Sequence, residues 1–406
     1  SVAAPMPQSG SAPAAGSATS SPASRAVRGS PASDTAVGGD GLIDTIIIAL
    51  RPRHRAYFPE TRLQEQRHDD QRLDLLCKWL EQDLGWREFH LAPASADASF
   101  RRYFRVTRAG ETFVVMDAPP GHEDVAPYLR IATMLAQIGV HAPAVLGRNE
   151  AQGFVLLTDL GSTTYLSALA DRTRAEALYR DALSALTRIQ SRGAAHAEQL
   201  PPYDERLLRF EMSLFTDWLL RRHLQLELSP TESADLRSVF DVLVDNALGQ
   251  PKVFVHRDYH SRNLMVCEDR NPGILDFQDA VCGPLTYDLV SLLRDCYLEW
   301  PVEQVRAWAL EQRDMAAAAG VMVGQDAAQF LRWFDCMGVQ RHLKASGIFA
   351  RLWHRDGKPG YLPDVPRTLR YVVRACADHP ELESLGTLVA ERVLPAVRAE
   401  SAAAPA

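Results

Sequence analysis

The sequence lacks the features by which several classes of protein are recognised. Its six cysteines are scattered and form no C-x-x-C pair, which favours reduced thiols in the core of a cytosolic protein over a disulfide framework. Basic residues are not in excess: 44 lysines and arginines stand against 51 acidic residues, so the net charge is −7 and no nucleic-acid partner is expected. No apolar run is long enough to cross a bilayer, so no membrane role is expected either. The sequence specifies no protein partner.

Residues 1–69 are expected to lie outside the folded part of the chain. Residues 1–39 are dominated by serine, alanine, proline and glycine, with no acidic residue before Asp34. Such a composition cannot bury enough apolar surface to offset the entropy of ordering the chain. Residues 43–50 are apolar but far too few to span a bilayer, and residues 51–70 carry no strong pattern. The sequence therefore predicts a disordered, low-complexity extension.

A small mixed β lobe is predicted to follow, over residues 70–161. Apolar residues from Leu73 to Leu84 recur at helical spacing, and Gly85 gives that helix an end. The other elements expected in this lobe are strands at 99–107, 111–116 and 154–158 and a helix at 124–138.

Helical patterns dominate the second lobe, which is predicted over residues 162–398. The expected helices cover 175–190, 204–224, 231–247, 287–299, 302–319, 327–349, 366–377 and 382–398. The predicted fold class is therefore α+β, with a small β lobe followed by a mainly helical large lobe.

The most informative segment lies in the second lobe, between residues 253 and 279. His256-Arg-Asp258 is followed by Asn263 with four residues between the aspartate and the asparagine, and Asp276 ends a short apolar run. Phosphoryl transfer needs a carboxylate that accepts the proton of the attacking hydroxyl and hard oxygen ligands for Mg²⁺. At this spacing Asp258 is the predicted catalytic base, and Asn263 and Asp276 are the predicted magnesium ligands.

Other polar residues of the segment are assigned to the scaffold of the loop. His256 and His260 are four apart and could bind zinc on a helix, but the flanking valine-rich run favours a strand-to-loop transition and the glutamate of an H-E-x-x-H motif is absent. His256 is therefore predicted to bond the backbone of the loop, and His260 either to do the same, which is favoured, or to approach the phosphate. Asp279 could assist the metal or bond the loop, and the second role is favoured. Asp288 is predicted to steady the backbone near Asp258.

Several strings resemble the aminoglycoside phosphotransferase family, whose fold is a two-lobed relative of the protein kinases. They are Val-Leu-Leu-Thr-Asp-Leu-Gly at 155–161, Gly-Pro-Leu-Thr-Tyr-Asp-Leu at 283–289, and the segment from His256 to Asp279. The resemblance covers roughly residues 70–390 and implies ATP and Mg²⁺ as cofactors. The strings at 214–218 and 340–351 are similar to those of family members that phosphorylate the C1 hydroxyl of N-acetylmuramic acid and N-acetylglucosamine in peptidoglycan recycling. The resemblance implies that activity.

The nucleotide side departs from the family pattern. The strand at 113–117 has no lysine to steady the α- and β-phosphates, and the phosphate-covering loop at 95–100 is not rich in glycine. Ser99 could offer a hydroxyl to a phosphate, and Arg101 or Arg102 could supply the missing charge. In the hinge that the resemblance implies, Leu157 and Asp159 are predicted to contact the nucleotide. These departures also leave open a nucleotide-binding pseudokinase.

The acceptor side is assigned to Glu211, Arg341, Lys344 and Arg351. The segment at 342–355 is basic, which suits a sugar that bears a carboxylate better than a polycationic aminoglycoside. A kinase for another sugar, for choline or for an antibiotic remains the alternative.

Overall fold

The computed structural model describes residues 71–96, 100–322, 324 and 326–403. All of them belong to one compact unit. The predicted extension at 1–69 lies outside the described residues. Within the described part of the chain, no helix is both long and apolar enough to cross a membrane.

The small lobe is built on an antiparallel sheet of five strands in the order β1-β2-β3-β5-β4. Its elements are β1 (His90–Ala96), β2 (Arg102–Arg108), β3 (Glu111–Asp117), α2 (Ala126–Ile138), β4 (Val145–Asn149) and β5 (Phe154–Thr158). The turn between β2 and β3 takes positive φ at Ala109 and Gly110, as a two-residue hairpin requires. The strands predicted at 99–107, 111–116 and 154–158 and the helix at 124–138 are confirmed with shifts of up to three residues at their ends, whereas β1 and β4 were missed. Each missed strand pairs through a register shift that breaks a clean alternation.

Alternate residues of the central strands face opposite sides of this sheet. Val115 and Leu156 join a separate core around Trp79, which lies in the helical segment that starts at residue 71. Met116 and Leu157 face the other way and pack with α2 in the core that continues through the large lobe. The period of two in β3 and β5 therefore produces a sheet covered on both faces.

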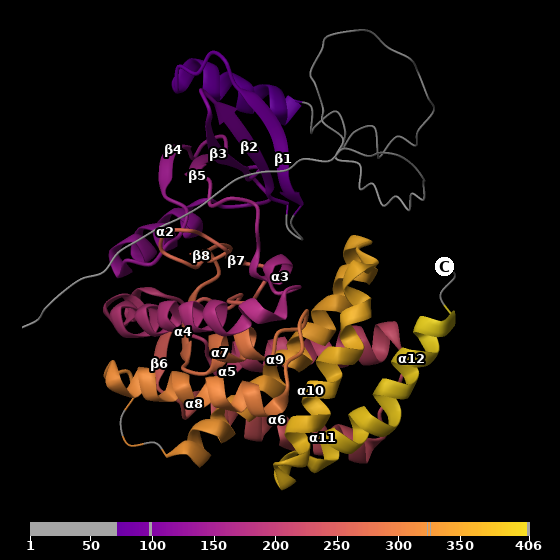
Figure 1. Ribbon diagram of the computed structural model, residues 1–406. Coiled ribbons are helices and arrows are strands. Elements are labelled where there is room, and N and C mark those ends of the chain that lie inside the picture. The colour runs from indigo at the N-terminus through magenta and orange to yellow at the C-terminus, as the bar shows by residue number, and fades with distance from the viewer. Residues whose placement is uncertain (1–70, 97–99, 323, 325, 404–406) are drawn as a thin grey trace, which may run out of the picture. The chain divides into compact units, whose positions relative to one another are not determined.

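The large lobe is mainly helical (Figure 1). Its α-helices are α3 (Tyr165–Ala168), α4 (Ala175–Arg192), α5 (Glu205–Leu214), α6 (Pro230–Leu248), α7 (Tyr287–Leu293), α8 (Val302–Ala318), α9 (Ala327–Asp356), α10 (Val365–Ala377), α11 (Glu383–Leu388) and α12 (Leu394–Ala403). Shorter 3₁₀ and π turns of this lobe are η2 (Arg172–Arg174), η3 (Gly193–Gln199), η4 (Phe215–His223), η5 (Pro359–Asp364), η6 (Pro380–Leu382) and η7 (Val389–Val393), while the π turn η1 (Trp79–Asp83) belongs to the small lobe. Local signals set several ends: Ser229 and Glu232 form a capping box at the start of α6, and Gly357 ends α9 with a φ of 65°.

Several helix predictions in this lobe are wrong in extent. The helix predicted at 204–224 is divided into α5 and the π turn η4. The helix predicted at 287–299 ends at Leu293, because the next residues turn away and Asp295 bonds backbone amides instead. The helix predicted at 382–398 is interrupted by the π turn η7. Helix α9 runs seven residues beyond its predicted end at 349. The six cysteines are free, and three of them, Cys296, Cys336 and Cys376, are buried as expected, while the others are half-buried.

Candidate active site

Two small antiparallel pairs of strands carry the segment with the predicted catalytic residues. β6 (Lys252–Val255) pairs with β9 (Val281–Pro284), and β7 (Leu264–Met265) pairs with β8 (Gly273–Ile274). The loop at 256–263 connects β6 to β7, and Asp276 follows β8. This loop is not helical, so the helix face on which His256 and His260 would meet a zinc ion is not formed.

Carboxylates from elsewhere in the large lobe hold the backbone of this loop. Asp288, on α7, accepts the amide N–H groups of His256 at 2.6 Å and Arg257 at 2.9 Å. Asp295 accepts the amide of Ser261 at 2.9 Å. Arg257 has a φ of 78°, a conformation that a non-glycine residue keeps only when its surroundings fix it. Burial raises the pKa of Asp288 to about 7, although its two amide bonds act in the opposite direction.

The two histidines lie within the same loop. His256 is fully buried, and its Nδ1 accepts the amide N–H of Asp258 at 3.2 Å. Burial lowers the pKa of His256 to about 4, so the ring is neutral at physiological pH. The ring of His260 meets the ring of Tyr297 edge-on at 5.5 Å, and burial lowers its pKa too.

Asn263 and Asp276 come together in a way that fits magnesium. The amide nitrogen of Asn263 lies 3.0 Å from the carbonyl oxygen of Asp258 and 3.3 Å from Oδ2 of Asp276. The amide oxygen of Asn263 is thus left as a possible ligand beside a carboxylate. Two hard oxygen donors suffice for Mg²⁺, which takes its remaining ligands from water and phosphates. Gln278 donates to the other oxygen of Asp276 at 2.7 Å, whereas Asp279 is exposed and bonds nothing in the described part of the chain.

Asp258 lies among positive charges. Burial opposes ionisation of its carboxyl, but cations that include Lys344, Arg257 and Arg341 outweigh that effect and hold the pKa of Asp258 below its ordinary value. The carboxylate is therefore ionised at neutral pH, which is the state in which it can accept a proton.

The structure changes the role expected of Glu211. Its side chain is only 2% exposed, and Oε1 binds Arg257 and, at 3.0 Å, Lys344. Its Oε2 accepts the hydroxyl of Tyr203 and the amide of Gln340. Both oxygens are fully used, so no acceptor remains for a sugar hydroxyl. Glu211 instead orients two of the cations that surround Asp258.

The three cations assigned to the acceptor side lie along α9 and differ in their surroundings. Lys344 is fixed by Glu211 and by the hydroxyl of Tyr287 at 2.8 Å. Arg341 is 6% exposed, and the one hydrogen bond shown for it among the described residues is a long one of 3.8 Å to Sγ of Cys296. Arg351 is half-buried two turns beyond Lys344, and burial lowers its pKa.

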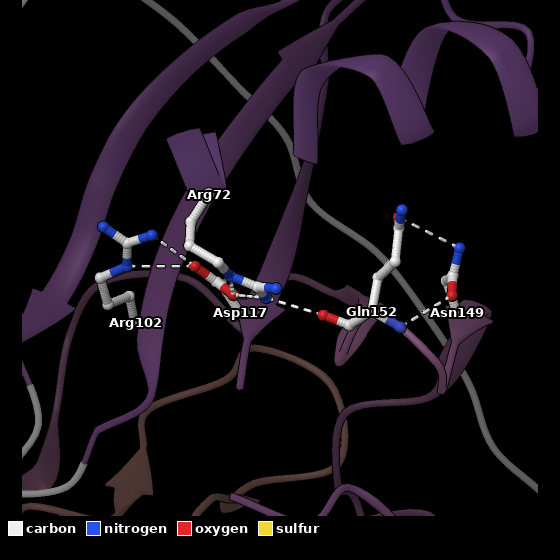
Figure 2. A network of polar contacts seen from close by, with 5 residues as sticks. All are labelled: Arg72, Arg102, Asp117, Asn149 and Gln152. Atoms are coloured by element: carbon white, nitrogen blue, oxygen red, sulfur yellow. Dashed lines mark hydrogen bonds and ion pairs between the residues drawn. The ribbon is translucent and has the colours of Figure 1, made fainter. Parts of the chain in front are cut away.

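On the nucleotide side the structure separates Arg101 from Arg102. Arg102 donates to Asp117 at the end of β3, and this buried carboxylate also binds Arg72, as Figure 2 shows. Arg101 instead pairs with Glu123 at 2.9 Å. Burial lowers the pKa of Arg101, but the net shift is upward, and Glu123 and Asp276 are among the groups that raise it. Arg101 is thus the arginine that faces the predicted metal ligands, while Arg102 binds within the sheet lobe.

The structure does not describe one of the other residues predicted to contact the nucleotide, and it shows that the remaining two are buried or already bonded. Ser99 lies outside the described residues. Leu157 is 2% exposed and sits between β3 and β4 in the sheet. Asp159 binds Arg105 at 2.6 and 3.0 Å and accepts the amide of Gly161. Burial raises the pKa of Asp159, but these bonds outweigh it and lower the pKa overall. Asp159 therefore fixes the turn after β5.

Comparison with known proteins identifies the class. The model of the phosphotransferase enzyme family matches residues 90–321, and the chain belongs to that family. Among solved structures, a choline kinase from Streptococcus pneumoniae (TM-score 0.52, 13% identity, 75% of this chain and 98% of that one) and an ethanolamine kinase from Plasmodium vivax (TM-score 0.53, 10% identity, 75% and 89%) share the fold. The predicted two-lobed fold class is thereby confirmed.

The chain is also similar to particular members of the family. The N-acetylmuramate/N-acetylglucosamine kinase of Pseudomonas aeruginosa is 48% identical over 332 residues, which cover 79% of this chain and 97% of that protein. The kinase of the same name from Neisseria meningitidis is 44% identical over 80% of this chain and 96% of that protein.

Sequence analysis missed several residues of the site, and two of them have partners that are distant in the chain. Asp295 was placed inside a helix, although an aspartate in mid-helix was a signal against that prediction. Gln278, two residues after Asp276, carried no separate signal. Arg257 stands within the motif, but only the structure reveals its pairing with Glu211.

Proposed function

We propose that this protein transfers the γ-phosphoryl group of ATP to the C1 hydroxyl of N-acetylmuramic acid and N-acetylglucosamine, as a cytoplasmic step of peptidoglycan recycling. The observation that carries the proposal is the position of Asp258. Its ionised carboxylate lies in one short loop with Asn263, whose side chain reaches Asp276. The names of the relatives supply the choice of sugars.

Asp258 would orient the C1 hydroxyl and accept its proton as the oxygen attacks phosphorus. An anomeric hydroxyl is more acidic than an ordinary alcohol, so a carboxylate of low pKa is an adequate base. The hydrogen bonds that Asp288 and Asp295 accept from the loop keep Asp258 in place, which serves a reaction that depends on positioning.

Mg²⁺ bound by Asn263 and Asp276 would neutralise charge on the phosphates of the nucleotide. Arg101 would supply charge that the family usually takes from a strand lysine, with Glu123 holding the guanidinium in position. Lys344 and Arg341 act on Asp258 electrostatically, and they would also stabilise negative charge that builds up on the transferred group and the acceptor.

The charges around Asp258 also bear on the alternatives. Arg257, Lys344 and Arg341 surround it, and Glu211 is already fully bonded. A cationic acceptor such as an aminoglycoside or choline would meet like charges there. An intact base with both metal ligands has no purpose in a pseudokinase, so a small-molecule kinase is the better interpretation.

The test is phosphorylation of each sugar with ATP and Mg²⁺, with the position of the phosphate determined by NMR. We expect a C1 phosphate on both sugars. Phosphate at another carbon would support a sugar kinase but contradict transfer to the C1 hydroxyl. Absence of turnover with either sugar, in protein that binds ATP by calorimetry, would contradict the proposed function.

A further inference from the structure

Arg262 lies in the loop between Asp258 and Asn263 and has an unusual environment. Its guanidinium carbon is 3.9 Å from the ring centroid of Tyr297 and 5.3 Å from that of Tyr361. The two tyrosines come from different parts of the large lobe, the segment after α7 and the turn η5. The side chain that sequence analysis passed over is thus held by aromatic rings within the catalytic loop.

The aromatic rings belong to a larger cluster that fixes their positions. Phe349, which is 5% exposed on α9, stacks on Tyr361 with ring centroids 5.7 Å apart and contacts Tyr297 at 6.4 Å. His260 meets the other side of Tyr297 at 5.5 Å. Arg262 therefore rests on a rigid support that joins the catalytic loop to α9.

The N–H groups of Arg262 remain available to a ligand. Contact with an aromatic face occupies the plane of a guanidinium, whereas its five N–H donors point outward from the edge. Arg262 is exposed, and within the described ranges it has no hydrogen bond and no carboxylate at ion-pair distance. Neighbouring arginines differ in this respect, because Arg257, Arg294 and Arg367 are each paired with a carboxylate.

The position of Arg262 indicates which substrate it faces. Its aromatic contacts come from the helical lobe, as do Arg341 and Lys344 beside Asp258, whereas Arg101 approaches Asp276 from the sheet lobe. The loop turns back on itself twice, through bonds from His260 N–H to the carbonyl of Asp258 and from Asn263 N–H to the carbonyl of His260. Arg262 thus lies in a compact loop between Asp258 and Asn263, and its aromatic partners belong to the helical lobe that also supplies Arg341 and Lys344.

We propose that Arg262 is a specificity residue that binds the carboxylate of the acceptor sugar. This inference rests on the proposed function. N-acetylmuramic acid differs from N-acetylglucosamine by a lactyl ether that ends in a carboxylate, and a planar guanidinium binds a carboxylate through two parallel hydrogen bonds. The tyrosine faces hold the guanidinium in one orientation, which reduces the entropy lost when the sugar binds.

The test compares the two sugars in wild-type protein and in Arg262→Ala. A charge-assisted pair predicts that the variant raises the KM for N-acetylmuramic acid by about 10- to 100-fold. The KM for N-acetylglucosamine and for ATP should stay within about twofold, because neither uses the lactyl subsite. Arg180→Ala, which removes an exposed arginine of α4, is the control and should change none of these constants.

A second experiment removes the charge from the substrate instead of from the protein. The methyl ester of N-acetylmuramic acid keeps the bulk of the lactyl group without its charge, so wild-type protein should prefer the acid and Arg262→Ala should not. Equal losses with both sugars, a change in the KM for ATP alone, or no change would each overturn the assignment. If the wild-type protein phosphorylates only N-acetylglucosamine, the role assigned to Arg262 is wrong but the proposed sugar-kinase activity is still supported. Protein that phosphorylates neither sugar would contradict the proposed function itself.

Discussion

Asp258 and Asp279 are both aspartates of the same segment, but the structure gives them different surroundings. Asp258 has several cations nearby that keep its carboxyl ionised. Asp279 is exposed and has no hydrogen bond or ion pair in the described part of the chain. The difference makes Asp279 a matched control for a substitution at Asp258.

Replacing Asp258 by asparagine should reduce kcat by about 10²- to 10⁴-fold, the usual contribution of a general base. The KM for ATP should change little, because the predicted metal ligands Asn263 and Asp276 remain. Steady-state kinetics with the sugar that the wild-type protein uses would measure both constants. Asp279→Asn should retain near-normal kcat. Near-normal turnover in Asp258→Asn would reject the base, and a large loss in Asp279→Asn would restore a role for that residue at the metal.

Arg101 and Arg102 are adjacent, so their variants separate nucleotide binding from stability. Arg101→Ala should raise the KM for ATP by about tenfold, as expected for loss of one charge-assisted contact. Arg102→Ala should leave that KM nearly unchanged. It should instead lower the free energy of unfolding by about 1–3 kcal/mol, because Asp117 is buried and would lose one of the two arginines that pair with it among the described residues.

Kinetics and urea unfolding on the same preparations would measure both effects. The opposite result, with ATP binding lost in Arg102→Ala and preserved in Arg101→Ala, would show that the ion pair with Glu123 is only structural.

At the scale of elements, helix α9 positions much of the acceptor side. It carries Arg341 and Lys344, and its Gly347 lies directly against the junction of α5 and η4. A Cβ at Gly347 would lie 2.3 Å from the carbonyl carbon of Leu214, which is backbone and cannot move aside locally. This close approach allows Lys344 to reach Glu211 on α5.

Gly347→Ala should therefore lower the free energy of unfolding by about 3 kcal/mol or more, although alanine favours helices by about 1 kcal/mol over glycine. Gly338→Ala, in the same helix, is the control. Its Cβ would meet the tip of the Arg294 side chain at 2.9 Å, and that tip can shift, so we expect a change within about 1 kcal/mol. Urea unfolding would measure both values. Equal stability of the two variants would contradict the close helix contact.

At the scale of the whole described unit, one hydrophobic core runs through both lobes. It includes Met116 of β3, residues of α2 and the buried faces of the helices of the large lobe. Tyr128 of α2 packs against Phe277, next to the predicted metal ligand Asp276, with ring centroids 4.7 Å apart. A continuous core predicts that the sheet lobe and the helical lobe unfold together.

Phe277→Ala tests this continuity. Removal of a fully buried phenylalanine should cost about 3–5 kcal/mol and move the whole unfolding curve. Far-UV circular dichroism and tryptophan fluorescence should give the same midpoint in urea, since tryptophans lie in both cores. Phe210→Ala, whose side chain is 56% exposed, should leave the midpoint in place. Two separate transitions, of which only one shifts, would show that the lobes unfold independently.

The sequence by itself determined the two-lobed fold class and most of the elements, and it predicted which residues would serve phosphoryl transfer. Helix and strand patterns are local, and Asp258, Asn263 and Asp276 lie close together in the chain, so their spacing carried the prediction. Strands β1 and β4 were not predicted, because irregular pairing breaks the alternation of apolar and polar residues from which strands are recognised.

Only the tertiary structure decided which partner each charged side chain contacts. Glu211 meets Lys344 across 133 residues of chain, and Arg262 meets Tyr361 across 99, distances over which no sequence pattern links two side chains. Whether a charged residue binds a ligand or another residue depends on which opposite charge comes near it after folding. For that reason the sequence could predict Asp258 as the catalytic base, whereas only the fold shows that Glu211 is bonded within the protein and that Arg262 rests on two tyrosine rings.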